Sequence, residues 1–191
     1  MLKTPITAII LAGGKSTRMQ GNDKGLLLLK GLPLYRHVID KINPQVTDII
    51  INTNRHIEQY QQSGYRVICD ELDGFLGPLA GIYSGLVRST TPWNLVVSCD
   101  TPFLPDDLVL HLQQNIADRP AAYVFDGEKS HPTILLIHRN MAEKIRSYLM
   151  QGDRKLLLFL ESINAAMVNL ADQKQSFINI NTPEELSIWN Q

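Results

Sequence analysis

The chain has 191 residues, of which 44% are hydrophobic and 19% charged, and its formal net charge is -1. This is an ordinary globular composition with enough length for a substantial core, and the balanced charge gives no general attraction to nucleic acid or acidic membranes. The two cysteines, Cys69 and Cys99, have neither CxxC spacing nor paired histidines, which excludes the usual zinc patterns.

The first half of the chain alternates short apolar strands with helical patterns. A near-continuous apolar run predicts a buried strand over 6–11, and the run is far shorter than the roughly twenty residues of a membrane span, so a cytoplasmic protein is expected. Pro33 is placed for the first turn of a helix. This alternation predicts a parallel α/β sheet with right-handed crossovers. Further strands are expected at 48–52, 66–69 and 94–98, and helices at 57–62 and 79–88.

The second half is less regular. Apolar runs at 121–125 and 133–137 flank Asp126-Gly127, a hairpin-like signal for an antiparallel addition to the sheet. With no internal repeat or linker, residues 1–191 are expected to form one domain. The remaining predicted elements are helices at 141–150 and 155–160, a last strand at 176–180, and a final helix opened by the capping sequence Thr182-Pro183-Glu184-Glu185.

A glycine-rich loop from Leu11 to Lys24 follows the first strand. In open α/β sheets, ligands bind beyond the carboxyl ends of the strands, so a ligand-binding loop is expected here. Gly13 and Gly14 allow the backbone to approach an anion closely, and Lys15, Arg18 and Lys24 add positive charge that suits a polyphosphate. The alternative is a solvated turn with surface cations.

Two familiar nucleotide-binding motifs fail in this loop. A Walker A sequence needs a glycine five residues before Gly14, and position 9 is Ile. The dinucleotide pattern GxGxxG needs glycines where Lys15 and Arg18 stand. A P-loop GTPase and a dinucleotide-dependent enzyme are therefore disfavoured.

Asp100 follows the apolar run at 94–98, where Cys99-Asp100-Thr101-Pro102 ends the expected strand. A carboxylate at that position, across from a phosphate-binding loop, is well placed for Mg²⁺. This ion takes one or two protein carboxylates and completes its shell with phosphates and water. The structural alternative is a capped turn before a helix that starts near Pro105.

Polar residues end two further strands at the same expected edge of the sheet. Asp70 could accept hydrogen bonds from the amino group and ring N–H of a purine, and Asn52 offers both a donor and an acceptor. Gly77 precedes a helix whose free N–H groups could face a nucleotide. Each of these residues could instead serve only to cap a turn.

These residues together resemble the GT-A-like nucleotidyltransferases, and most closely the molybdenum cofactor guanylyltransferases. The likeness runs from Ile9 to the final helix, and it implies a three-layer α/β/α fold with a mostly parallel, Rossmann-like mixed sheet. The motifs that carry it are Leu11-Ala12-Gly13-Gly14-x-x-x-Arg18-Met19, Asp23-Lys24-Gly25-Leu26-Leu27, Gly31-x-Pro33-Leu34, Asn52-x-Asn54-Arg55, Gly77-Pro78-Leu79-Ala80-Gly81, Cys99-Asp100-Thr101-Pro102, His131-Pro132-Thr133 and Asn179-Ile180-Asn181-Thr182-Pro183-Glu184-Glu185-Leu186.

The resemblance implies transfer of GMP from GTP to the terminal phosphate of molybdopterin, in its molybdenum-loaded form, with release of pyrophosphate. Mg²⁺ would be the cofactor, with Mn²⁺ as a substitute. The part up to about residue 105 would bind the nucleotide, and the remainder the acceptor. Gln20 is a departure, because relatives usually have glycine there. The implied GTP-binding residues are Leu11, Ala12, Gly13, Gly14, Lys24, Asn52, Asp70, Gly77 and Asp100; Lys24, Asp100 and Arg18 would be catalytic, and Asp100 would bind the metal.

Candidate acceptor-binding residues come from the second half. Asn179 and Asn181 alternate along the expected last strand, so both side chains would point to one face and could meet a pterin. His131 and Arg154 are further candidates, although a histidine before proline is more often structural. An acceptor phosphate with a second pKa of about 6 is already largely ionised at neutral pH, so little general-base help is needed.

Other functions remain open from the sequence. A CTP-dependent molybdopterin cytidylyltransferase or another GT-A-like nucleotidyltransferase would share these motifs, because base choice depends on how Asp70 and Gly77 are placed. A non-catalytic GTP-binding regulatory subunit would release no pyrophosphate, but it need not keep both Lys24 and Asp100. A monomer is the default, with no nucleic-acid or membrane partner, and contacts with other cofactor-assembly proteins are implied by the family alone.

Overall fold

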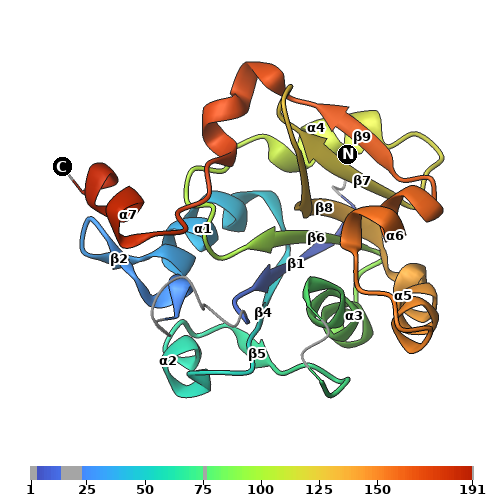
Figure 1. Ribbon diagram of the computed structural model, residues 1–191, viewed down its shortest axis with the longest axis horizontal. Coiled ribbons are helices and arrows are strands. Elements are labelled where there is room, and N and C mark those ends of the chain that lie inside the picture. Colours follow the sequence, from blue (N-terminus) through green and yellow to red (C-terminus); the bar gives the residue numbers. More distant parts are fainter. Residues whose placement is uncertain (1–3, 14–22, 75–76, 191) are drawn as a thin grey trace.

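A seven-stranded mixed sheet forms the middle layer of the structure (Figure 1). The structure is a computed structural model that describes residues 4–13, 23–74 and 77–190. The strand order is β5-β4-β1-β6-β8-β7-β9, and a separate small sheet pairs β2 with β3. The strands are β1 (Ile6–Leu11), β2 (Leu28–Leu29), β3 (Leu32–Pro33), β4 (Asp48–Asn52), β5 (Arg66–Ile68), β6 (Trp93–Ser98), β7 (Ala121–Phe125), β8 (Ser130–His138) and β9 (Ala166–Asn169).

Helices connect these strands and cover both faces of the large sheet. The α-helices are α1 (Leu34–Ile42), α2 (Ile57–Gln61), α3 (Pro78–Arg88), α4 (Leu108–Asn115), α5 (Ala142–Met150), α6 (Leu156–Ser162) and α7 (Pro183–Trp189). Short 3₁₀ turns are η2 (Lys24–Leu26), η3 (Asn43–Gln45), η4 (Arg139–Met141) and η5 (Ala171–Phe177). Within the described residues, no helix is long and apolar enough to cross a membrane.

The first half of the sheet is parallel and the second half is mixed. β1 pairs in parallel with β4 and β6, and β4 pairs in parallel with β5. β8 runs antiparallel to both β6 and β7, as the hairpin signal predicted, and β9 is parallel to β7. Because β8 reverses the direction, β6 and β7 point the same way, and their carboxyl ends lie at the same edge of the sheet.

The two faces of the sheet bury two separate cores. Ala8 and Ile10 of β1 belong to a cluster that includes residues of α1 and α4. Ile9, between them, belongs to a second cluster that includes residues of α3, α5 and α6. Figure 1 shows α5 and α6 grouped beside α3. A strand that is covered on both faces needs apolar side chains at every position, which explains the uninterrupted apolar run of β1.

The sequence predictions for the C-terminal segment were partly wrong. Ser176 and Phe177 end η5, and the residues from 178 to 181 follow it without joining the sheet. The strand that completes this edge is instead β9, which pairs with β7. β9 has only four residues, alternately buried and exposed, so it lacks the long apolar run by which the other strands were recognised.

Candidate active site

The carboxyl ends of β1 and β6 lie where the chain changes its direction of winding. From β1 the chain proceeds outward through β4 to β5, then crosses to β6 on the other side of β1. Ligands of open α/β sheets bind at such a switch point. Two backbone bonds extend the pairing beyond the strands: Ala12 N donates to Asn52 O at 2.9 Å, and Cys99 N donates to Leu11 O at 3.1 Å. The glycine loop and the acid after β6 therefore start side by side.

Lys24 and Asp100 meet at this edge. Lys24 Nζ lies 3.4 Å from Asp100 Oδ2 and donates to Asn181 Oδ1 at 2.7 Å. Asp100 Oδ1 accepts from Ser98 Oγ at 2.6 Å and from Asn179 Nδ2 at 3.0 Å. Asp100 is only 7% exposed. Its carboxylate is thus held with one oxygen occupied by neutral donors and the other turned toward a cation.

Asn179 and Asn181 reach this cluster from an irregular segment, not from the strand that the sequence predicted. Ile180 N donates to Asp100 O at 2.9 Å, and Asn181 N donates to Glu185 Oε2 at 2.5 Å. Glu185 and Thr182 form the predicted capping box at the start of α7. The cap of α7 and the backbone of Asp100 therefore fix the segment so that both amides contact the Lys24–Asp100 pair.

A single 3₁₀ turn places Lys24. Asp23 caps this turn, since its Oδ1 accepts from Gly25 N at 3.1 Å, and the same oxygen accepts from Tyr60 Oη at 2.6 Å. Gly25 is packed against Cys99: a Cβ at this position would lie 3.2 Å from Cys99 Sγ and still nearer to Tyr60 Oη. The turn that carries Lys24 therefore rests directly on the residue before Asp100.

The two groups beneath this turn are neutral. Burial raises the pKa of the Tyr60 hydroxyl above its ordinary range, and the nearby Cys99 and Asp23 raise it further. Burial likewise raises the pKa of the Cys99 thiol, and Asp100 and Asp23 add to the effect. A nucleophilic or metal-binding cysteine needs the thiolate form, so Cys99 serves as a packing residue.

Asp70 and two asparagines form a second polar group at the same edge. Asp70 Oδ1 accepts from Asn52 Nδ2 at 3.0 Å, and Asp70 Oδ2 accepts from Asn54 Nδ2 at 2.8 Å. Asp70 N in turn donates to Asn54 Oδ1 at 2.8 Å. Each carboxylate oxygen has further acceptor capacity, so a ligand with two neighbouring N–H donors could still bind.

Small residues let the neighbouring segments approach this group. A Cβ on Gly81 of α3 would lie 2.9 Å from Leu11 Cδ2 and would touch Asn52 Oδ1. Gly77 caps the start of α3 at φ +76°, a conformation that favours glycine. A Cβ on Gly13 would lie 3.6 Å from the backbone of Asn54. The structure therefore brings the described GTP-binding candidates to one edge of the sheet.

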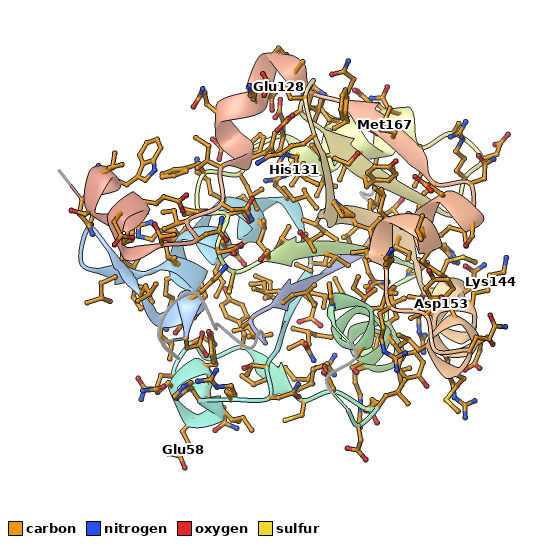
Figure 2. The ribbon with its side chains drawn as sticks, in the orientation of Figure 1. Glu58, Glu128, His131, Lys144, Asp153 and Met167 are labelled. Atoms are coloured by element: carbon orange, nitrogen blue, oxygen red, sulfur yellow. The ribbon has the colours of Figure 1, made fainter. Side chains whose placement is uncertain are left out.

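Two predicted site residues, Gly14 and Arg18, lie outside the described residues. Two others are described but make contacts elsewhere. His131 is 6% exposed and its Nε2 lies 2.7 Å from Asp126 Oδ2, while its ring lies 5.6 Å from that of Phe177; Figure 2 shows it inside the molecule. Arg154 Nη1 donates to Leu149 O at 2.9 Å, and Figure 2 places its neighbour Asp153 at the edge of the molecule near α5.

Three contributors to the site were not predicted as site residues. Asn54 and Ser98 each stand two residues from a recognised candidate, Asn52 and Asp100, and this spacing was the available signal. Tyr60 gave a weaker signal, as the single aromatic residue in a polar helix. Its partner Asp23 is 37 residues away, a contact that no local pattern predicts.

The donor set at Asp100 fits a magnesium ion that is shared with phosphates. No group of three or more His, Cys, Asp or Glu side chains suited to a metal occurs among the described residues. Magnesium does not need one, because one or two carboxylates suffice when substrate phosphates and water supply the other oxygens. Asp100 Oδ2 already faces the Lys24 ammonium, which shows that this oxygen is oriented toward a cation.

Known proteins resemble this chain in sequence and in fold. Residues 8–168 match the family model described as a MobA-like NTP transferase domain. Curated relatives named molybdenum cofactor guanylyltransferase, from Yersinia pestis and Yersinia pseudotuberculosis, are 48% identical over 186 residues, covering 97% of this chain and 95% of theirs.

Solved structures share the fold. A molybdopterin-guanine dinucleotide biosynthesis protein A from Archaeoglobus fulgidus superposes with a TM-score of 0.76 at 24% identity, over 96% of each chain. A putative protein from Aquifex aeolicus gives a TM-score of 0.79 at 24% identity, over 95% of this chain and 96% of its own. At this identity the likeness shows the α/β fold alone.

Proposed function

Because the chain belongs to the MobA-like NTP transferase family, we propose that it transfers GMP from GTP to the terminal phosphate of molybdopterin, in its molybdenum-loaded form, and releases pyrophosphate. The observation that carries this proposal is the meeting of Lys24 and Asp100 at the switch point of the sheet. A cation-binding carboxylate and a lysine in one place suit a polyphosphate substrate.

Asp100 is the residue that would hold Mg²⁺, with Mn²⁺ as a substitute. When bound, the ion would neutralise charge on the triphosphate. Ser98 and Asn179 donate to the other carboxylate oxygen, Oδ1, so Oδ2 would remain available to such an ion. When GTP is bound, the Lys24 ammonium would turn from Asp100 to the phosphates. Arg18 would offset further charge on the pyrophosphate.

The second polar group would hold the nucleoside. Asp70 would accept hydrogen bonds from the amino group and ring N–H of guanine, while the amides of Asn52 and Asn54 hold the orientation of its carboxylate. The backbone from Leu11 to Gly14 and the start of α3 at Gly77 would complete the nucleotide site. If this edge of β1, β4 and β5 binds the nucleotide, the part of the chain before about residue 105 would be its nucleotide-binding part.

Acceptor binding is proposed for the second half. Asn179 and Asn181 bond to Asp100 and Lys24, so the acceptor phosphate would bind beside these two asparagines. Arg154 would lie further along the acceptor, because it keeps donors beyond the one that caps Leu149 O. The buried His131, bonded to Asp126, would support the fold and not contact the acceptor. No base is needed, because the phosphate nucleophile is ionised, and the task of the protein is positioning and charge neutralisation. We place the reaction in the cytoplasm, with a monomer that contacts other cofactor-assembly proteins only transiently.

Pyrophosphate release from GTP tests the proposal. Purified protein with Mg²⁺ is given GTP, with and without a molybdopterin-type acceptor, and the same assay is run with CTP. The expected result is pyrophosphate that depends on both the acceptor and GTP. GTP binding without pyrophosphate would indicate a regulatory subunit, preference for CTP a cytidylyltransferase, and free phosphate a GTPase; each would overturn the proposal.

A further inference from the structure

Tyr60 is the single residue that α2 buries, and its side chain has no exposure to solvent. The rest of this short helix is exposed and mostly polar. The Tyr60 ring packs on that of Tyr35 with centroids 4.9 Å apart, and its hydroxyl donates to Asp23 Oδ1 at 2.6 Å. A tyrosine that is fully buried normally finds a partner for its hydroxyl, and here the partner is the residue before Lys24.

The contacts continue from this hydroxyl to the lysine. Asp23 Oδ1 also accepts from Gly25 N, which closes the turn around Lys24. No space remains for a side chain at Gly25, because Tyr60 Oη and Cys99 fill it. The turn therefore packs directly against the Tyr60 hydroxyl and Cys99. Lys24 extends from this turn to Asp100 and Asn181.

We propose that Tyr60 is a positioning residue for Lys24: its buried hydroxyl, bonded to Asp23, fixes the 3₁₀ turn and so the place of the Lys24 ammonium beside Asp100. Removal of the hydroxyl leaves a buried carboxylate short of a donor, and the turn relieves this by shifting. The inference rests on the proposed function, because Lys24 matters for turnover only if the protein transfers a nucleotidyl group.

The first test compares Tyr60→Phe with a matched control, Tyr65→Phe. Tyr65 Oη also donates one hydrogen bond, to Asn43 Oδ1 at 3.3 Å, but it lies outside the turn. Two readouts are used: the rate at which acetic anhydride labels Lys24, and kcat and KM for GTP and for the acceptor. In Tyr60→Phe we expect severalfold faster labelling and a fall in kcat/KM for GTP of about tenfold to a hundredfold, with the acceptor KM unchanged. Tyr65→Phe should match the wild type.

A second pair of variants separates positioning from packing. Asp23→Asn keeps the oxygen that accepts from Tyr60 Oη and Gly25 N and should retain most activity, whereas Asp23→Ala should resemble Tyr60→Phe. Asp23→Ala removes the bond from Tyr60 Oη and also the cap on Gly25 N, so adding Tyr60→Phe to it should cause little further loss, because the Tyr60 bond is already absent. If Tyr60→Phe does not fold, the comparison of Asp23→Asn with Asp23→Ala tests whether the hydrogen bonds to Asp23 position Lys24.

The outcomes distinguish this inference from the proposed function. A folded Tyr60→Phe that has a lower melting temperature but unchanged Lys24 labelling and unchanged kcat/KM would overturn the positioning role. The wild type could release no pyrophosphate with the acceptor while Tyr60→Phe is still labelled faster at Lys24. In that case the positioning role of Tyr60 would be retained and the proposed function would be wrong.

Discussion

Two buried aspartates follow strands at the same edge of the sheet, and their partners differ. Asp100 follows β6 and is 7% exposed; Asp126 follows β7 and is 2% exposed. Asp126 Oδ1 accepts from Glu128 N at 2.9 Å and from Lys129 N at 2.8 Å, and its Oδ2 lies 2.7 Å from His131 Nε2. All of these donors come from the next five residues of the chain. Asp100 accepts from Ser98, two residues away, but it also draws on Lys24 and Asn179, which are 76 and 79 residues away.

A structural carboxylate and a functional one differ here in whether their hydrogen-bond donors come mainly from neighbouring residues or also from distant segments of the chain. Burial alone would raise the pKa of Asp126, but hydrogen bonds from Lys129 N, His131 and Glu128 N outweigh it and lower the pKa below its ordinary range. Its two backbone donors, Glu128 N and Lys129 N, lie in the turn that follows it, which is the arrangement of an Asx turn, and His131 is the second residue of β8. The distant segments at Asp100 meet only in the folded protein, and Asp100 Oδ2 faces a cation that a substrate could displace. We infer that Asp100 serves the reaction and Asp126 the fold.

Asp100→Asn should cause the largest loss of activity. The change is nearly isosteric and removes only the charge that would hold the metal ion. We expect kcat to fall by about a thousandfold or more, equivalent to about 4 kcal/mol of transition-state stabilisation. Pyrophosphate release at saturating Mg²⁺ measures this. Thermal unfolding is the control, because the melting temperature should change little, and unchanged turnover at saturating Mg²⁺ would exclude the metal role of Asp100.

Asp126→Asn should show the opposite behaviour, with lower stability and retained turnover. Loss of charge-assisted bonds in the interior should reduce the free energy of unfolding by about 2 kcal/mol, measured by urea titration at neutral pH. The folded-state pKa is lowered, so the ionised group stabilises the protein above its ordinary pKa of 3.8. The difference from wild type should therefore be constant above about pH 5 and narrow as the pH falls below that value.

The exposed Asp118 supplies the control for this comparison. Asp118→Asn should change the free energy of unfolding by less than about 0.5 kcal/mol at any of these pH values. If Asp126→Asn instead lowered kcat as strongly as Asp100→Asn while the protein stayed folded, the division between the two aspartates would be wrong.

The sequence predicts the nucleotide end of the site because that end depends on local patterns. A buried parallel strand is recognised from its apolar run, and parallel strands present their carboxyl ends at one edge. Leu11, Asn52, Asp70 and Asp100 are all strand-end residues or their neighbours, so predicting the strands also predicted that these residues meet. The resemblance to a family then added Lys24, which the residue pattern alone did not distinguish from other cations of the loop.

The remainder depends on contacts between distant segments, which the sequence pattern does not contain. Asn179 and Asn181 were expected on a strand, and they are placed instead by the bond from Ile180 N to Asp100 O and by the cap of α7. Tyr60 was not predicted at all, because its function requires knowing that Asp23 lies beside it. Local periodicity shows which residues are buried, but it does not show which buried polar groups are partners.

Asn181→Ala should have a moderate effect, and it tests whether the asparagine acts through Lys24. Loss of the 2.7 Å bond to Lys24 Nζ should lower kcat/KM for GTP about tenfold. The Lys24→Ala, Asn181→Ala double variant should then be no worse than Lys24→Ala, because the two residues act as one unit. Asn169→Ala, which removes an exposed amide that accepts from Ala171 N, is the control. Additive losses in kcat/KM for GTP would instead show that Asn181 acts independently of Lys24.

Arg154→Ala should have the smallest effect, and it decides how far the acceptor site extends from Asp100. Arg154 Nη1 caps Leu149 O and Asp153 O, and its other donors are available to a ligand. If these donors hold the acceptor, the acceptor KM should rise a few-fold while the KM for GTP stays constant. The contact with Leu149 O contributes to stability in either case, so a fall of about 1 kcal/mol in the free energy of unfolding is expected and is not diagnostic. Arg154→Lys keeps the charge but loses the planar fork, so it should restore the acceptor KM only in part. An unchanged acceptor KM in Arg154→Ala would confine acceptor recognition to the segment beside Asp100, where Asn179 and Asn181 already lie.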